Sequence, residues 1–164
     1  MLLRVASRRA VAASRRQLTV AVTGASGYVG SYITEELLKR GHDVRALVRG
    51  CETNTEKAAH LQALPGAERL TLIDGGDLSI QGSFKNGLAG ADAVVHAAAT
   101  VVIGRDPSIA SAAVDGVENV LSSLPPTCKT VVLTSSIAAV ISLDKASLTF
   151  DEGDWNDYSS LANG

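Results

Sequence analysis

The chain has 164 residues, of which 46% are hydrophobic and 20% are charged, so it is long enough for one globular domain with its own core. Five of its 15 basic residues lie within the first 17 positions, which leaves 10 basic against 17 acidic residues in the remainder. This acidic remainder excludes the basic surface of a nucleic-acid-binding protein, and no apolar run approaches the roughly 20 residues of a membrane span. The two cysteines, Cys51 and Cys128, fit no disulfide or metal-ligand pattern, so we expect free thiols and no metal site.

The first 17 residues, MLLRVASRRAVAASRRQ, are rich in Arg, Ala and Ser and contain no acidic residue. This composition is typical of a mitochondrial transit peptide. The alternatives are a disordered basic tail or a start codon assigned too far upstream. We therefore predict a basic leader over residues 1–17, a mitochondrial or cytoplasmic location, and one domain over residues 18–164.

Short runs of Val, Leu and Ile alternate with longer amphipathic stretches from Leu18 onward. These patterns predict strands at residues 18–22, 43–48, 68–73, 93–96 and 130–135, with helices at 28–40, 55–64, 83–88 and 107–124. The strands lack polar alternation, which indicates parallel strands buried on both faces. The predicted fold is therefore α/β, a Rossmann-type doubly wound parallel sheet that is truncated after about five strands. After Ser136 the turn-forming residues predict a loop with at most one helical turn.

A glycine-rich segment, TGASGYVG at residues 23–30, joins the first predicted strand to the first predicted helix. Gly24 suits the tight turn, Gly27 lets the backbone approach a pyrophosphate, and Gly30 lets the helix pack close to the sheet. The first amides of the helix and its dipole then favour a phosphate. The segment predicts a dinucleotide-binding site, and the alternative is a glycine-rich turn that serves packing only.

The end of the second predicted strand, DVRALVRG, distinguishes between nucleotides. A fold that prefers NAD usually places an acidic residue there, about 20 residues past the glycines, to hold the ribose 2′-hydroxyl. Here Val48 and Arg49 occupy that place, and Arg45 precedes them. Because arginine pairs with phosphate, these residues favour NADP over NAD. The alternative is that both arginines are simply solvated.

Further motifs follow in a fixed order: VRALVR, DGGDLS, VVHAAA, VVLTSSIAAV and DEGDWND. Together with VTGASGYVGS, they resemble the extended short-chain dehydrogenases/reductases of the NAD-dependent epimerase/dehydratase superfamily. The resemblance is to the branch of dihydroflavonol reductases, cinnamoyl-CoA reductases and 3β-hydroxysteroid dehydrogenase-like proteins. It runs from about Thr19 to Tyr158, and the TGxxGxxG spacing is distinctive of the extended group.

The resemblance implies an oxidoreductase that transfers a hydride between NADP(H) and a small-molecule carbonyl or alcohol, and a homodimer is compatible with a full-length member. It implies that Asp77 touches the adenine and that the segment after the fourth strand lies beneath the cofactor. The residues that it assigns to cofactor binding are Thr23, Gly24, Ser26, Gly27, Tyr28, Val29, Gly30, Arg45, Arg49, Asp77, Leu78, His96, Ala97, Ala98 and Ala99.

The same resemblance assigns a catalytic role to Ser136, which would orient the substrate oxygen, with Ser135 as the near alternative. Small polar residues that bond the local backbone at a strand end are the other explanation of this TSS sequence. The family's catalytic tyrosine and the lysine four residues later have no counterpart here, because Tyr28, Tyr32 and Tyr158 are followed at that spacing by Tyr32, Glu36 and Ala162.

The sequence therefore resembles the N-terminal half of the family. We expect a partial gene model or a truncated transcript rather than a genuine half-length product, since an open sheet would expose a strand edge. Two other functions remain open: a non-catalytic NADP-binding module, and a sugar-nucleotide epimerase or dehydratase.

Overall fold

The computed structural model describes residues 16–99, 107–142 and 149–157. The predicted leader lies outside the described residues apart from Arg16 and Gln17. The side-chain amide of Gln17 donates a hydrogen bond to the carboxylate of Asp43 at 2.8 Å. The last residue of the predicted leader is thus attached to the start of the second strand.

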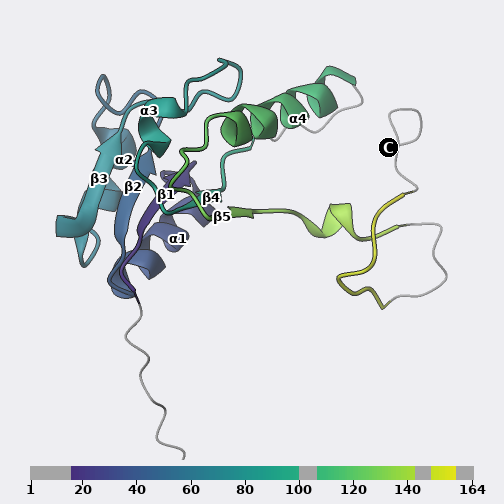
Figure 1. The fold of residues 1–164 in the computed structure, drawn as a ribbon, viewed down its shortest axis with the longest axis horizontal. Coiled ribbons are helices and arrows are strands. Elements are labelled where there is room, and N and C mark those ends of the chain that lie inside the picture. The colour runs from purple at the N-terminus through teal and green to yellow at the C-terminus, as the bar shows by residue number, and fades with distance from the viewer. Residues whose placement is uncertain (1–15, 100–106, 143–148, 158–164) are drawn as a thin grey trace, which may run out of the picture.

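A parallel sheet of five strands forms the centre of the molecule (Figure 1). Its spatial order is β3-β2-β1-β4-β5. The strand bounds are β1 (Thr19–Thr23), β2 (Asp43–Leu47), β3 (Leu70–Ile73), β4 (Ala93–His96) and β5 (Thr130–Leu133). This arrangement confirms the predicted doubly wound parallel sheet. The order reverses at β1, and ligands of such sheets bind beyond the carboxyl ends of the strands at this point.

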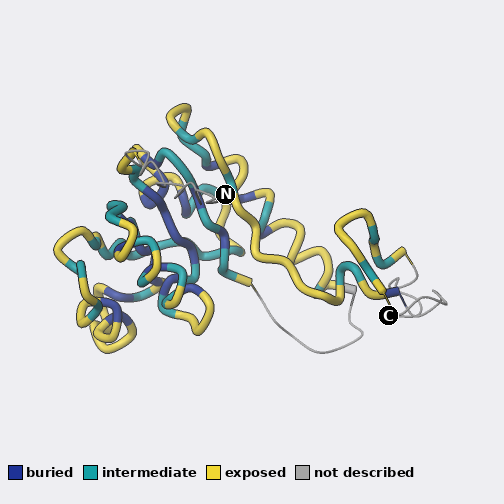
Figure 2. The backbone as a smooth tube through the Cα atoms, turned by 90° about the horizontal axis from the view of Figure 1, so that it is seen from below, coloured by how far each residue is buried: buried dark blue, intermediate teal, exposed yellow. Residues whose placement is uncertain are grey.

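Helices cover both faces of the sheet. The elements α1 (Tyr28–Lys39) and α2 (Glu56–Gln62) pack on one face, where Val22, Leu38, Val44 and Leu61 are buried. The elements α3 (Lys85–Leu88) and α4 (Pro107–Ser122) lie on the other, over a cluster that includes Ala21, Leu47, Phe84, Leu88, Val94 and Val120. Burial of each large apolar side chain contributes about 1.5–3 kcal/mol. Figure 2 shows the buried residues gathered along the strands.

Several predicted bounds differ by two residues from the structure. The fourth helix ends at Ser122 rather than Leu124, and its last bonds run three residues back, from the Ser123 amide to the Val120 carbonyl at 3.1 Å. Pro125 disfavours helical backbone at the residue before it, which explains this early end. The third strand begins at Leu70 because η1 (Ala67–Arg69) forms a 3-10 turn before it.

The fifth strand is not buried on both faces, which corrects the prediction for that strand. Val132 and Leu133 are 50% and 51% exposed. Among the β5 residues, Val131 alone packs against the buried cluster under α3 and α4, and within the described sheet β5 pairs with β4 alone. Beyond β5 the chain runs away from the sheet to η2 (Ile137–Ala139), as Figure 1 shows. No helix within the described ranges has the length and apolarity to span a membrane.

Candidate nucleotide-binding site

The glycine-rich segment forms a turn in which three parts of the backbone approach closely. Gly24 has φ +66°, and a Cβ there would lie 2.7 Å from the amide nitrogen of Ala98 in the loop after β4. A Cβ on Gly30 would collide with the carbonyl oxygen of Gly24. Glycine is therefore required at both positions, at Gly24 also because its φ is positive.

The N-terminus of α1 is open to an anion. Gly27 caps this 12-residue helix without a side-chain hydrogen bond, and its first turn holds no acidic residue. The first amides of a helix have no intrahelical acceptor, and they lie at the positive end of the helix dipole. Both properties favour a phosphate at this position.

A cavity of about 620 Å³ lies beside this turn, at the carboxyl ends of β1, β2 and β4. This volume is in the range of small-molecule sites. Nine residues predicted to bind the cofactor line it: Gly24, Ser26, Gly27, Arg49, Asp77, Leu78, Ala97, Ala98 and Ala99. Four further lining residues were not predicted: Leu47, Lys57, Gly76 and Ser79. The structure thus brings together residues from four loops that are distant in sequence.

Two cationic side chains, those of Arg49 and Lys57, line this cavity. Arg49 follows β2, and its Nη1 lies 3.2 Å from the Asp77 carboxylate. Lys57 comes from α2, and its Nζ donates to the carbonyl oxygen of Arg49 at 3.3 Å. Arg49 is mostly exposed, with 72% of its side chain accessible. Its guanidinium can therefore exchange Asp77 for an incoming anion at little cost.

Two aspartates shape the loops around these cations. The hydroxyl and amide of Ser79 donate to the Asp77 carboxylate at 2.6 and 2.9 Å, and they, followed by Arg49, lower the pKa of Asp77 below its usual value. The amides of Gly50 and Glu52 donate to Asp74 at 2.7 and 3.1 Å and lower the pKa of that carboxyl. Both groups are thus held as carboxylates.

Thr23 and His96 lie beneath the cavity rather than in it. The Oγ1 of Thr23 accepts from the Ala98 amide at 3.2 Å and lies 2.6 Å from Nδ1 of His96. The contact is a hydrogen bond whose direction is set by the ring tautomer, since the hydroxyl has a second lone pair besides the one that accepts from Ala98. Burial lowers the pKa of His96, so the ring is neutral near pH 7. The pair fixes the loop that carries Ala97 and Ala98.

Arg45 does not reach the cavity. Its Nε and Nη2 donate to the carbonyl oxygens of Gly87 and Asn86 in α3, at 2.9 and 3.1 Å. Arg45 pairs with Ala21 in the middle of β1, two residues before the carboxyl end of β2. Two residues of a strand span about 6.6 Å, so Arg45 lies that far from the carboxyl end of β2. Its side chain bonds α3 instead of the phosphate end of the site.

Three other predicted positions contribute only backbone or packing. The side chains of Tyr28 and Val29 face a separate apolar hollow of about 410 Å³, which Tyr32 and Ile33 also line. Gly30 is buried under the glycine turn. Tyr28 and Val29 can therefore meet a phosphate only through their amides.

Ser136 lies after β5, at the start of η2, and its Oγ accepts from the Ala138 amide at 3.2 Å. It lines a hollow of about 580 Å³ together with Ser135, Ile137, Val140, Ile141 and Phe150. This hollow shares no lining residue with the nucleotide cavity. Within the described ranges, both cysteines are free and no group of acidic, His or Cys side chains could hold a metal ion.

Comparison with known proteins identifies a family and several similar reductases. The profile of the NAD dependent epimerase/dehydratase family matches residues 20–162. Dihydroflavonol 4-reductase of Arabidopsis thaliana is 36% identical over 148 residues, which are 87% of this chain and 38% of that protein.

Two solved structures have the same fold. Vestitone reductase from alfalfa (Medicago sativa) superimposes with a TM-score of 0.72 and 32% identity, over 86% of this chain and 43% of that one. Gre2 of Candida albicans in complex with NADPH gives a TM-score of 0.73 and 29% identity, over 87% and 45%. The chain thus spans 38% to 45% of the length of these relatives. From the profile match, the chain belongs to the NAD dependent epimerase/dehydratase family.

Proposed function

We propose that the chain binds NADP(H) and forms the nucleotide-binding part of a reductase that acts on a small-molecule carbonyl. One observation carries this proposal. The cavity at the carboxyl ends of the strands is lined by a glycine-rich turn that leads into a helix N-terminus without a side-chain cap, and by two cationic side chains, Arg49 and Lys57.

The residues fit the parts of a phosphorylated dinucleotide. Gly24, Gly27 and the first amides of α1 would hold the pyrophosphate, since both glycines line the cavity and the helix N-terminus has no side-chain cap. Asp77 and Leu78 line the same cavity and would hold the adenine. When bound, the nicotinamide supplies the hydride, and the chain's own residues position it and exclude water.

Arg49 and Lys57 support NADP over NAD. An acidic residue at the end of β2 would bond a ribose 2′-hydroxyl and repel a 2′-phosphate. This chain instead has Arg49 at that place, with the ammonium group of Lys57 3.3 Å from the Arg49 carbonyl. Two cations would bind the two negative charges of a 2′-phosphate by charge-assisted hydrogen bonds.

Ser136 is the residue that we propose to orient the substrate oxygen. It follows the carboxyl end of β5, the neighbour of β4, so it lies on the cofactor side of the sheet. Its Oγ accepts a backbone amide hydrogen bond, and its hydroxyl hydrogen can donate to a carbonyl oxygen. The similar reductases support a carbonyl substrate, and the exposed position of Ser136 leaves room for one.

Calorimetric titration with NADPH and NADH tests the nucleotide assignment. Loss of a charge-assisted phosphate contact in Arg49→Ala or Lys57→Ala should weaken NADPH binding by about tenfold and change NADH binding little. Arg45→Ala is the matched control, because its guanidinium bonds α3 and should leave the ratio of the two affinities unchanged. Equal losses for both nucleotides in the Arg49 and Lys57 variants would contradict the assignment.

Oxidation of NADPH by a panel of aldehydes and ketones tests the reaction itself. Turnover that Ser136→Ala removes, with unchanged NADPH affinity, is the result that we expect of a longer product that supplies the Tyr-x-x-x-Lys pair absent from this sequence. Binding of NADPH without turnover of any carbonyl would instead favour a non-catalytic nucleotide-binding module.

A further inference from the structure

A buried amide side chain outside the cavity holds the loop that lines one of its walls. Asn119 lies on α4 and is 1% exposed. Its Nδ2 donates to the Ile80 carbonyl at 2.7 Å and lies 3.4 Å from the carbonyls of Asp77 and Leu78. Its Oδ1 accepts from the Gly82 amide at 2.8 Å. One side chain thus bonds the backbone of most of the loop between Asp77 and Gly82.

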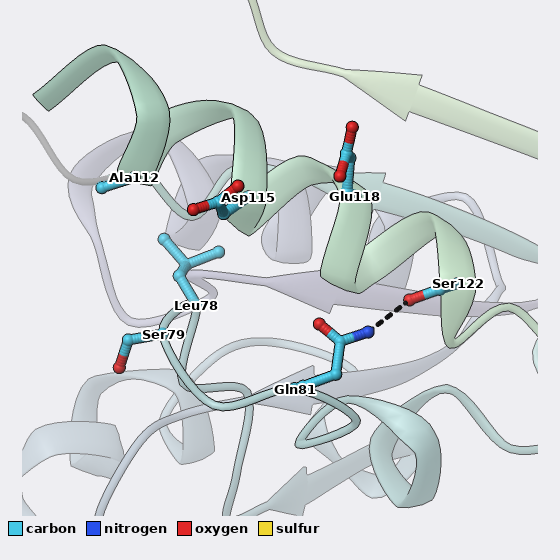
Figure 3. Close-up of a pocket in the computed structure, with 7 residues that line it drawn as sticks. All are labelled: Leu78, Ser79, Gln81, Ala112, Asp115, Glu118 and Ser122. Atoms are coloured by element: carbon cyan, nitrogen blue, oxygen red, sulfur yellow. Dashed lines mark hydrogen bonds between the residues drawn. The ribbon is translucent and has the colours of Figure 1, made fainter. Parts of the chain in front are cut away.

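This loop is not held by continuous packing against α4. Figure 3 shows a hollow between the two, with Leu78, Ser79 and Gln81 on one side and Ala112, Asp115 and Glu118 on the other. The volume of this hollow is about 450 Å³. The hydrogen bond from Gln81 to Ser122 in Figure 3 is exposed, so water competes for it. The buried bonds of Asn119 therefore carry more of the attachment.

Gly116 gives the loop a second, apolar contact with α4. A Cβ on Gly116 would lie 3.1 Å from Cδ2 of Leu78, so glycine lets Leu78 approach the helix. Leu78 also packs against the core under α3 and α4. The two contacts differ in kind, because Leu78 can slide along an apolar surface whereas the Asn119 bonds fix the backbone in one register.

The fixed backbone sets the direction of the groups that face the nucleotide cavity. Asp77 and Leu78 line that cavity, and the Asp77 carboxylate contacts Arg49 at 3.2 Å. A chain of contacts thus leads from Asn119 through the loop backbone to Asp77 and then to Arg49. We propose that Asn119 is a positioning residue that holds the adenosine side of the nucleotide site in its binding geometry. This inference rests on the proposed function.

Binding of 2′,5′-ADP, which carries the adenosine and the 2′-phosphate without the nicotinamide, tests the role of Asn119. Asn119→Asp keeps the shape and the acceptor, but it places a second oxygen against the carbonyls of Ile80, Asp77 and Leu78. We expect a loss of affinity for 2′,5′-ADP of about 10-fold to 100-fold, because a buried acceptor is left unpaired. Ser123→Ala is the matched control.

Ser123 suits this control because it is 6% exposed and its hydroxyl donates to the Asn119 carbonyl at 2.7 Å, a bond within α4 and its end. Its replacement should lower stability but leave 2′,5′-ADP affinity within about twofold of the unmodified chain. Both variants are measured at a temperature at which each is folded. Unchanged affinity in folded Asn119→Asp would overturn the role of Asn119.

The part of the site at which Asn119→Asp loses contact with the nucleotide distinguishes a positioning role from a general disruption of the fold. With excess NADPH, the ligand-induced change in the NMR chemical shift of the Gly27 amide should persist in Asn119→Asp. The corresponding changes for the Asp77 and Ser79 amides should be lost. Loss of both sets, or of neither, would contradict a role confined to the adenosine side. Absence of 2′,5′-ADP binding by the unmodified chain would instead overturn the proposed function, and the inference with it.

Hydrogen exchange of the unmodified chain decides the matter if Asn119→Asp does not fold. The Gly82 amide donates to Asn119, so its exchange should slow by about tenfold or more when 2′,5′-ADP binds. An exchange rate of the Gly82 amide that the ligand does not change would overturn the inference.

Discussion

Thr23 and His96 show how single side chains prepare the site without touching its ligand. The Thr23 hydroxyl joins the end of β1 to both His96 and the Ala98 amide, so one residue fixes two neighbouring strands and the loop beyond them. His96 also meets the Phe84 ring edge-on at 6.5 Å. An apolar surrounding of this kind resists charge on the imidazole.

The buried imidazole predicts a dependence of stability on pH. The pKa of His96 in the folded chain is below its ordinary value of 6.5, so the unfolded chain binds more protons as the pH falls. The free energy of unfolding should be constant above about pH 7 and decline below about pH 6.5, by at most about 1.4 kcal/mol per pH unit for one proton. Urea unfolding between about pH 8 and pH 5 measures this decline.

Two variants assign the decline to one histidine. His96→Gln should flatten the profile, whereas His60→Gln should keep it, because His60 lies exposed on α2. A profile that stays flat in the unmodified chain would contradict the neutral, buried His96.

At the scale of the element, the glycines of the turn between β1 and α1 have different roles. Gly30 serves packing, because the carbonyl of Gly24 occupies the position of its missing Cβ. Gly27 has an ordinary φ of −75°, and a Cβ there would lie 3.2 Å from the Gly24 carbonyl, a contact that small shifts relieve. We therefore infer that glycine is needed at position 27 for binding of the ligand more than for folding.

Alanine substitutions should separate these tasks. Gly30→Ala should lower the free energy of unfolding by about 1–3 kcal/mol or more, since backbone atoms must move to admit a methyl group. Gly27→Ala should change stability much less but weaken NADPH binding by about tenfold, because the methyl group meets the approaching pyrophosphate. Urea unfolding and calorimetry measure the two effects, and equal destabilisation by both substitutions would be inconsistent with this division.

The edge of the sheet matters at the scale of the whole molecule. Val132 and Leu133 on β5 are about half exposed, and Tyr28 and Tyr32 on α1 are 81% and 60% exposed. A strand edge with apolar side chains invites pairing with another chain. We therefore expect the 164-residue chain to self-associate as its concentration rises.

Val132→Lys should reduce this self-association and leave NADPH affinity unchanged, because β5 does not line the nucleotide cavity. Val131→Lys is the comparison: Val131 packs against the core under α4, so a charge there should lower stability by about 2 kcal/mol or more. Sedimentation velocity measures the association. Identical association of the unmodified chain and Val132→Lys would contradict a role for this edge.

Local patterns explain how much of this molecule the sequence could predict. The glycine turn, the positions of the strands along the chain and the place of Arg49 after the second strand depend on short-range spacing, so they could be predicted. Lys57 could not, because it lies on an exposed helix and only the packing of α2 brings it to Arg49. Asn119 bonds a loop about 40 positions earlier in the chain, and no local signal marks such a contact. The side chain of Arg45 bonds α3 and does not line the cavity, and the strand pattern does not tell how far a residue lies from the carboxyl edge.

The structure of the chain in complex with NADPH is the measurement that tests the central claim most directly. We predict the pyrophosphate at the first amides of α1 next to Gly27, the adenine beside Asp77 and Leu78, and the 2′-phosphate bonded by Arg49 and Lys57. A pyrophosphate bound away from the glycine turn, or a 2′-phosphate in solvent with neither cation in contact, would contradict the account.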